Sequence, residues 1–172
     1  MMPNFRPFHL LALLMISAIL ASCGFALRGS YSLPYESIYI SGADHLVSVA
    51  NLKRAIRTSG STTLATDPKE AEAIFIPAGE TRETQILSLT GSGRVREKRL
   101  VYRYSYRVVD SKGSNLIPPG TVEMNRDLTY ADSAVLAKEQ EEELLWRDME
   151  NDLVQQLMRR LSATTPRKHQ DE

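Results

Sequence analysis

The chain has 172 residues, and its 21 Lys and Arg residues balance its 21 Asp and Glu residues, so the formal net charge is zero. This balance argues against a nucleic-acid partner, because nucleic-acid-binding domains carry a basic excess on one face. One cysteine and three histidines offer no spacing typical of a metal site and no intrachain disulfide. We therefore expect one domain that is stabilised by its apolar core and has no cofactor.

The first 22 residues have the pattern of a secretory signal peptide. Arg6 supplies a positive charge, and the segment from Leu10 to Ala21 is apolar. This segment is shorter than the ~20 apolar residues that a transmembrane helix needs. We predict that residues 1–22 are removed. Because they contain Arg6 and no acidic residue, the mature chain would have 20 basic and 21 acidic residues and a net charge of −1.

The segment Leu20-Ala21-Ser22-Cys23 resembles the bacterial lipobox, in which the cysteine receives lipid and becomes the first residue of the mature protein. Two or more acyl chains anchor a protein durably, since each buried CH₂ contributes ~0.8 kcal/mol. The alternative is an unmodified cysteine after an ordinary signal peptide, but lone exported thiols are unusual. Gly24 stands where inner-membrane lipoproteins typically have Asp. We predict lipidation of Cys23 and anchoring in outer-membrane lipid at the periplasmic face.

A strand and a helix are predicted after a linker of residues 23–34. The β-branched and aromatic run from Ser37 to Ile40 is typical of a strand. Asp44 is a candidate N-cap of the helix, and Gly60 is a typical C-terminal stop. The helix itself is indicated by apolar residues at spacings of three and four, namely Leu46, Val49, Leu52 and Ile56.

Three further strands are predicted in the middle of the chain. A long strand runs from Ala73 to Leu89 with a break near Pro77 and Gly79, and residues 91–93 make a hairpin turn. The next strand alternates most clearly, and its half-buried face carries Leu100, Tyr102, Tyr104, Tyr106 and Val108. Residues 115–120 are predicted to form a loop. The last strand carries Val122, Met124, Leu128 and Tyr130, with Arg126 interrupting this apolar face.

A long helix is predicted from Asp132 or Ser133 to Leu161. Its apolar stripe consists of Val135, Leu136, Leu145, Met149, Leu153, Leu157 and Leu161. The polar tail 164–172 is predicted to be disordered. The order strand, helix, three strands, helix predicts an α+β fold with a single periplasmic domain over residues 35–163. We expect a two-layer sandwich with both helices packed on one face of a four-stranded sheet.

No group of residues suggests catalysis. His45 and His169 have no neighbouring ligands or catalytic partners in the sequence. Ser92 lies between two glycines, without the strand-to-helix elbow of serine hydrolases. The acidic residues Glu139 and Glu141 to Glu143 would spread around a helix, as on a solvated face. We expect no enzymatic activity.

A basic cluster follows the hairpin turn and contains Glu97 as its only acidic residue; its cations are Arg94, Arg96, Lys98, Arg99, Arg103 and Arg107. Because strand residues alternate between faces, Arg94, Arg96 and Lys98 are expected beside the apolar face that begins at Leu100. A phosphorylated amphiphile would suit such a surface, since guanidinium groups bind phosphate bidentately. The alternative is a solvated hairpin whose cations discourage edge pairing, and composition alone favours it.

Several segments together resemble the LptE family of lipopolysaccharide-assembly lipoproteins. The segment from Cys23 to Gly29 is similar to the opening of that family, and Gly93 to Glu97 is similar to its hairpin. The most recognisable block is in and before the long helix, and consists of Arg126, Tyr130-Ala131-Asp132, Leu136-Ala137-Lys138-Glu139, Glu142, Arg147-Asp148-Met149 and Arg160-Leu161. The resemblance covers most of the mature chain and implies two helices on a four-stranded sheet.

The resemblance also implies a non-enzymatic role. The protein would plug the lumen of the LptD β-barrel of the outer membrane, help to assemble that barrel, and assist lipopolysaccharide transport to the outer leaflet. Arg99, Arg103 and Arg107 would then face the partner, because lumen walls of such barrels are polar. Lys138 would contact lipopolysaccharide phosphates, with Arg94 and Arg96 as further binding residues.

Two other classes of function remain open. An auxiliary lipoprotein of an ABC-type lipid transporter would have the same anchor and a fold of similar size, but would associate with an inner-membrane complex. An anchored hydrolase would depend on one polar residue for activity, and the sequence offers no candidate for it.

Overall fold

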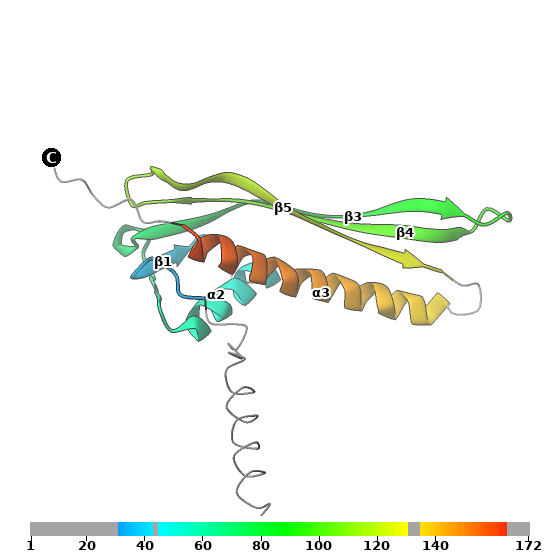
Figure 1. Ribbon diagram of the computed structural model, residues 1–172, viewed down its shortest axis with the longest axis horizontal. Helices are drawn as coiled ribbons and strands as arrows, with labels where there is room; N and C mark the ends of the chain where they lie inside the picture. Colours follow the sequence, from blue (N-terminus) through cyan, green and yellow to red (C-terminus); the bar gives the residue numbers. More distant parts are fainter. Residues whose placement is uncertain (1–30, 43–44, 131–134, 165–172) are drawn as a thin grey trace, which may run out of the picture. The chain divides into compact units, whose positions relative to one another are not determined.

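The computed structural model describes residues 31–42, 45–130 and 135–164, shown in colour in Figure 1. Their elements are β1 (Ser37–Ile40), α2 (Val47–Ser59), β2 (Thr63–Leu64), the short 3₁₀ helix η1 (Pro68–Glu70), β3 (Ala73–Leu89), β4 (Val95–Val109), β5 (Asn115–Thr129) and α3 (Val135–Ser162). The predicted signal peptide, the lipidation residue Cys23, Asp44, both predicted starts of the long helix and almost all of the tail lie outside these residues. The same holds for the side chains of Val135 and Leu136.

The five strands form one sheet in the order β2-β1-β3-β4-β5, with parallel pairing around β1 and antiparallel pairing in the rest. Figure 1 shows α2 and α3 on the same side of this sheet, which confirms the α+β sandwich. The predicted number of four strands is wrong. The additional strand is β2, whose two residues are too few to produce a periodic pattern in the sequence.

The middle strands are longer than predicted. β3 continues through the expected break, because Pro77 pairs with Tyr106 and Gly79 pairs with Ser105, which leaves Ala78 as the extra residue of a bulge. The predicted loop 115–120 is also wrong, since these residues belong to β5. β5 is an edge strand, where prolines are tolerated because backbone groups on one side have no ladder partner.

Two hairpin turns of the same design join these strands. In the first, Gly93 N donates to Thr90 O at 2.9 Å, and Gly93 has a φ of 80°. In the second, Gly113 N donates to Asp110 O at 3.0 Å, and Gly113 has a φ of 84°. Glycine suits both positions, because side chains rarely adopt this left-handed conformation.

The predicted end of the first helix is confirmed, whereas its predicted N-cap, Asp44, is wrong, because the N-cap of α2 is Leu46, two residues later. α2 ends at Gly60, which has a φ of 69° and acts as a left-handed C-cap. At the other end, the N-cap is Leu46, which makes no side-chain capping hydrogen bond. Tertiary packing therefore stabilises α2 more than its caps do, and its buried apolar residues are Val49, Leu52 and Ile56.

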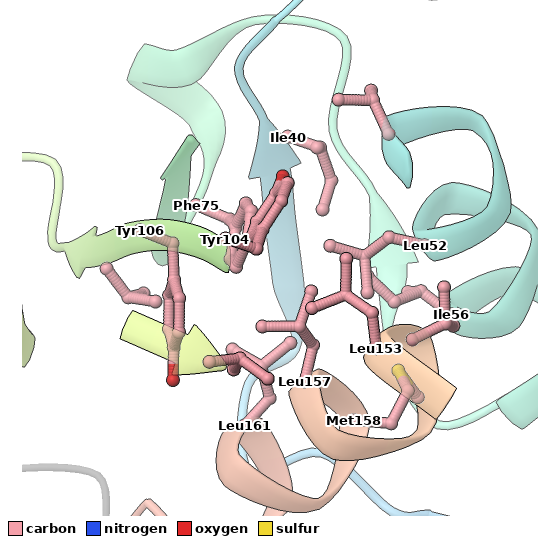
Figure 2. Close-up of a cluster of buried hydrophobic side chains, with 14 of the residues drawn as sticks. Ile40, Leu52, Ile56, Phe75, Tyr104, Tyr106, Leu153, Leu157, Met158 and Leu161 are labelled. Atoms are coloured by element: carbon pink, nitrogen blue, oxygen red, sulfur yellow. The ribbon is translucent and has the colours of Figure 1, made fainter. Parts of the chain in front are cut away.

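The core lies between the sheet and the two helices, as Figure 2 shows for its labelled side chains. The alternation of β4 is confirmed, because its inward residues Leu100, Tyr102, Tyr104, Tyr106 and Val108 are at most 2% exposed. The rings of Phe75 and Tyr106 stack with centroids 5.3 Å apart. The stripe of α3 meets this face through Met149, Leu153, Leu157 and Leu161, all fully buried. Each such aliphatic side chain contributes ~1.5–3 kcal/mol on burial.

The sheet has two ends of different construction. At the compact end, α2, β1 and the C-terminal half of α3 enclose the core. At the other end, β3, β4 and β5 extend as an arm, which we define as residues 84–99 and 125–130. Figure 1 shows the N-terminal half of α3 running along the same side of this arm. Candidate binding residues predicted from the sequence lie mainly in these extended parts.

Candidate functional site

The sheet face that points away from the helices carries a lattice of ion pairs. Arg99 forks onto Asp127 with distances of 2.7 and 2.8 Å. Arg103 bridges two strands, donating to Glu83 at 2.9 Å and to Glu123 at 2.8 Å. Hydrogen bonding to Arg99 lowers the pKa of the Asp127 carboxyl, and the bonds to Glu83 and Glu123 raise the pKa of Arg103.

This lattice makes the outer face polar while keeping its charge nearly balanced. Ser105 and Thr121 extend it with a hydroxyl pair at 2.9 Å, and Arg107 is exposed on the same face. Ion pairs at such exposure contribute little to stability. Sequence reasoning identified the cations but not their acidic partners, because these lie 20 and 28 residues away in the chain. Aligning the alternating patterns of neighbouring strands is the signal that would have paired them.

The face that points toward α3 is apolar at the compact end and ionic along the arm. Lys98 lies on this face as predicted, and its Nζ is 3.4 Å from Glu142 Oε2 on α3. Tyr130 OH donates to the same Glu142 oxygen at 2.8 Å. Arg126, which interrupts the apolar face of β5, pairs with Asp152 of α3 at 2.5 Å. Ion pairs thus join the arm to α3 where apolar contacts end.

A second polar cluster lies between the arm and the compact end. Glu80 accepts hydrogen bonds from Ser48 of α2 and from Tyr102 of β4, both at 2.7 Å. The guanidinium of Arg82 lies 5.3 Å from the ring centroid of Tyr102 and pairs with Glu150 of α3. Burial, followed by the bond to Glu80, raises the pKa of Tyr102. This cluster ties both helices to the sheet.

The three residues predicted to bind lipopolysaccharide lie near the ends of the extended elements. Arg94 follows the hairpin turn, and its Nε donates to Ser92 Oγ at 3.3 Å. Arg96 is exposed, and the β3–β4 register shifts next to it, between Ser88 and Leu89 of β3. Lys138 lies in the first turn of α3 and pairs with Glu141 at 2.6 Å. Their binding role stays a prediction.

Exposed apolar side chains accompany these cations. In β3, Ile86 is 60% exposed, Leu87 is 43% exposed and Leu89 is 53% exposed. All three lie in the arm, and Ile86 pairs with Lys98 in the β3–β4 register. The arm therefore places apolar surface next to positive charge, which is the combination expected for an amphiphilic anion.

The described residues contain no group of three or more His, Cys, Asp and Glu side chains arranged for a metal ion. Within the same residues, no helix has the length and apolar character needed to cross a membrane. An open depression lies at the compact end rather than in the arm. It is lined by Pro34, Glu36, Ser37, Lys69, Glu70, Ala71 and Glu72.

Comparison with known proteins gives matches over most of the described domain. The family model described as LptE, lipopolysaccharide-assembly, matches residues 35–161. The protein named LPS-assembly lipoprotein LptE from Yersinia enterocolitica is 31% identical over 164 residues, which cover 89% of this chain and 75% of that protein.

Solved structures of bacterial lipoproteins have the same fold. The solution NMR structure of lipoprotein B from Nitrosomonas europaea, described as uncharacterized, is 40% identical, has a TM-score of 0.70 and covers 81% of this chain and 91% of that chain. Rare lipoprotein B from Shewanella oneidensis is 21% identical, has a TM-score of 0.63 and covers 74% of this chain and 94% of that chain. A minor lipoprotein from Acinetobacter baumannii is 23% identical, has a TM-score of 0.61 and covers 76% of this chain and 93% of that chain. The last two show a likeness of fold.

Proposed function

Because the chain belongs to the LptE family of lipopolysaccharide-assembly proteins, we propose that it is a non-enzymatic, lipid-anchored component of lipopolysaccharide transport to the outer leaflet. In this proposal the domain of residues 35–163 is held at the periplasmic face of the outer membrane. There it occupies the lumen of an LptD-type β-barrel, helps that barrel to assemble, and contacts lipopolysaccharide during transport.

The proposed anchor is lipid on Cys23, followed by the linker 23–34 after removal of residues 1–22. The variant Cys23→Ala lacks the thiol that would carry lipid, so it should appear in the soluble fraction or in the wrong membrane. Mass spectrometry of the native protein should find a fatty-acylated residue 23 at its N-terminus. An intact leader, or an N-terminal cysteine without fatty acid, would contradict the anchor.

The observation that carries the plug role is the polar lattice on the outer sheet face. The interior of an outer-membrane barrel is polar, so a plug needs a surface rich in hydrogen-bonding groups with little net charge. Arg99 and Arg103 meet this requirement through their pairs with acidic side chains of neighbouring strands. Exposed Arg107 adds a donor to the same face. These three residues are the proposed partner-facing set.

Contact with lipopolysaccharide is assigned to Lys138, Arg94 and Arg96. Phosphate oxygens bind guanidinium and ammonium groups through charge-assisted hydrogen bonds. The double variant Lys138→Asp, Arg94→Asp should weaken binding of purified lipopolysaccharide, and the loss should be largest at low salt because surface charges are screened. A double variant with the same charge change at exposed residues of the compact end, Arg54→Asp with Arg159→Asp, is the control.

Affinity purification from native membranes tests the plug role. The tagged protein should bring down an outer-membrane barrel in a near-stoichiometric complex that survives mild detergent. Recovery with an inner-membrane ATP-driven lipid transporter instead would support the auxiliary-lipoprotein alternative. Recovery of the protein alone from correctly localised material would contradict both.

A further inference from the structure

The interface between α3 and the sheet changes in chemistry along the helix. Its buried row runs through Leu161, Leu157, Leu153 and Met149 toward the N-terminus. The same spacing of three and four residues continues through Leu145 to Glu142 and Lys138. An apolar row thus becomes an ionic row without leaving the sheet-facing side, since Glu142 still contacts the sheet.

The facing strand changes in the same way. The inward row of β4 is buried from Val108 to Leu100, and Lys98 is the next inward residue. Its Nζ lies 3.4 Å from Glu142 Oε2 and 4.7 Å from the ring centroid of Tyr130. The side chains of Lys98 and Glu142 are only 25% and 22% exposed. This is a half-buried charge cluster between two layers rather than a solvated surface pair.

The carboxylate of Glu142 interacts with two other groups in this cluster. Glu142 Oε2 accepts from Tyr130 OH at 2.8 Å and lies near Lys98 Nζ. Hydrogen bonding to Tyr130 and the charge of Glu142 raise the pKa of Lys98, so the ammonium stays charged at neutral pH. Glu142 is also one turn along α3 from Lys138, which places the two side chains about 5–6 Å apart at Cβ.

We propose that Lys98 and Lys138 together form a phosphate-binding site between the arm and α3, and that Glu142 occupies this site until a phosphorylated lipid displaces its carboxylate from Lys98. The proposal rests on the lipopolysaccharide-transport function above and adds to it a binding residue, Lys98, and a built-in competing anion. The present partners of the two lysines are different carboxylates, Glu142 for Lys98 and Glu141 for Lys138. A phosphate monoester carries about −1.5 to −2 charges near neutral pH, so a single lipid phosphate can pair with both lysines at once.

The ligand is inferred to be an amphiphile rather than free phosphate. Ile86, the cross-strand partner of Lys98, is 60% exposed, and Leu87 beside it is 43% exposed. Exposed aliphatic side chains beside a cation site match a molecule with acyl chains next to its phosphate groups. Lipopolysaccharide has this arrangement.

Two exposed residues provide matched controls. Lys98→Gln removes a lysine from the helix-facing side of the arm, whereas Lys112→Gln removes an exposed lysine from the second hairpin turn. Glu142→Gln removes the competing charge, whereas Glu143→Gln changes the next residue of α3, which is exposed and pairs with Arg147. Lys98→Arg keeps the positive charge. Thermal unfolding of each variant checks that it folds.

The experiment measures binding of purified lipopolysaccharide to the full chain and its variants at low salt. Lys98→Gln should weaken binding about fivefold, equivalent to about 1 kcal/mol, and Lys98→Arg should restore it. Glu142→Gln should tighten binding, and the Lys112 and Glu143 variants should bind like the wild type. Dephosphorylated lipopolysaccharide should bind to Lys98→Gln and to the wild type with equal affinity.

Other results would overturn the proposal in distinguishable ways. Unchanged binding by both Lys98→Gln and Glu142→Gln, with loss in the Lys138 and Arg94 double variant, would reject the site but keep the proposed function. Absence of lipopolysaccharide binding by the wild type would reject both. If Lys98→Gln weakened binding of phosphatidylglycerol vesicles or inorganic phosphate as much as binding of lipopolysaccharide, lipopolysaccharide would be rejected as the specific ligand.

Discussion

The compact end and the arm share the strands β3, β4 and β5, yet different interactions hold each end to α3. At the compact end, aromatic residues of β4 pack against buried leucines of α3. Along the arm, Lys98, Tyr130 and Arg126 reach α3 through ion pairs and hydrogen bonds. Apolar packing cannot be exchanged for water without a large cost, whereas polar contacts exchange with water or with a ligand.

This difference separates stability from binding within one sheet. Substitutions in the compact end should act on folding, and substitutions in the arm should act on ligand or partner contacts with little effect on folding.

Leu157→Ala should destabilise the domain most. Its side chain is fully buried between α3 and the sheet, and truncation of a buried leucine costs about 2–5 kcal/mol. Leu87→Ala, in the arm and 43% exposed, should change the free energy of unfolding by no more than about 0.5 kcal/mol. Urea denaturation measures both. Equal losses would show that the arm is part of the stabilising core.

Glu80→Ala should have an intermediate effect, because Glu80 lies between the two ends. The variant leaves the buried hydroxyl of Tyr102 and the hydroxyl of Ser48 without their acceptor, which should cost about 1–3 kcal/mol. Glu83→Ala, on the same strand but on the outer face, is the matched control and should cost less. A larger loss for Glu83 than for Glu80 would contradict the assignment of this cluster to the fold.

Alkaline pH should destabilise the protein through its buried tyrosines. Burial raises the pKa of Tyr104 to about 12, above the usual value near 10. The protonated form is therefore favoured by folding, so its contribution is complete below about pH 10 and is lost as the pH rises toward about 12. Tyr104→Phe should reduce this pH dependence between pH 9 and pH 11.5. An unchanged slope in thermal unfolding midpoints would contradict this origin.

Arg103→Gln should have the smallest effect on stability. Its ion pairs with Glu83 and Glu123 are exposed, and such pairs are weakened by salt and contribute little. Recovery of the barrel partner should nevertheless fall, because two acidic side chains would lose their shared cation on the proposed contact face. Normal recovery at every salt concentration would exclude Arg103 from this contact.

The periodic parts of the fold could be predicted from the sequence. Alternation gave the buried face of β4, and the stripe of α3 gave Met149, Leu153, Leu157 and Leu161 as buried residues. Elements without a repeating pattern were missed. β2 has only two residues. The start of β5 contains two prolines, which are typical of a loop in sequence, and the edge position that makes them acceptable in a strand is a tertiary property.

Candidate site residues were predictable as residue types but not as pairs. The sequence indicated the cations of β4, yet the partner of Lys98 is 44 residues away on α3. The register shift between Ser88 and Leu89 of β3 likewise has no signature in the sequence. Local patterns indicate which side chains share a face, whereas charge pairing depends on how separate elements meet.

Site-specific photo-crosslinking in cells tests the separation of roles most directly. A crosslinker at Ile86 samples the helix-facing side of the arm, at Arg107 the outer sheet face, and at Thr58 the exposed surface of α2. We expect lipopolysaccharide adducts at position 86, a barrel adduct at position 107 and neither at position 58. Lipopolysaccharide adducts at position 58 and none at position 86 would contradict this separation of roles.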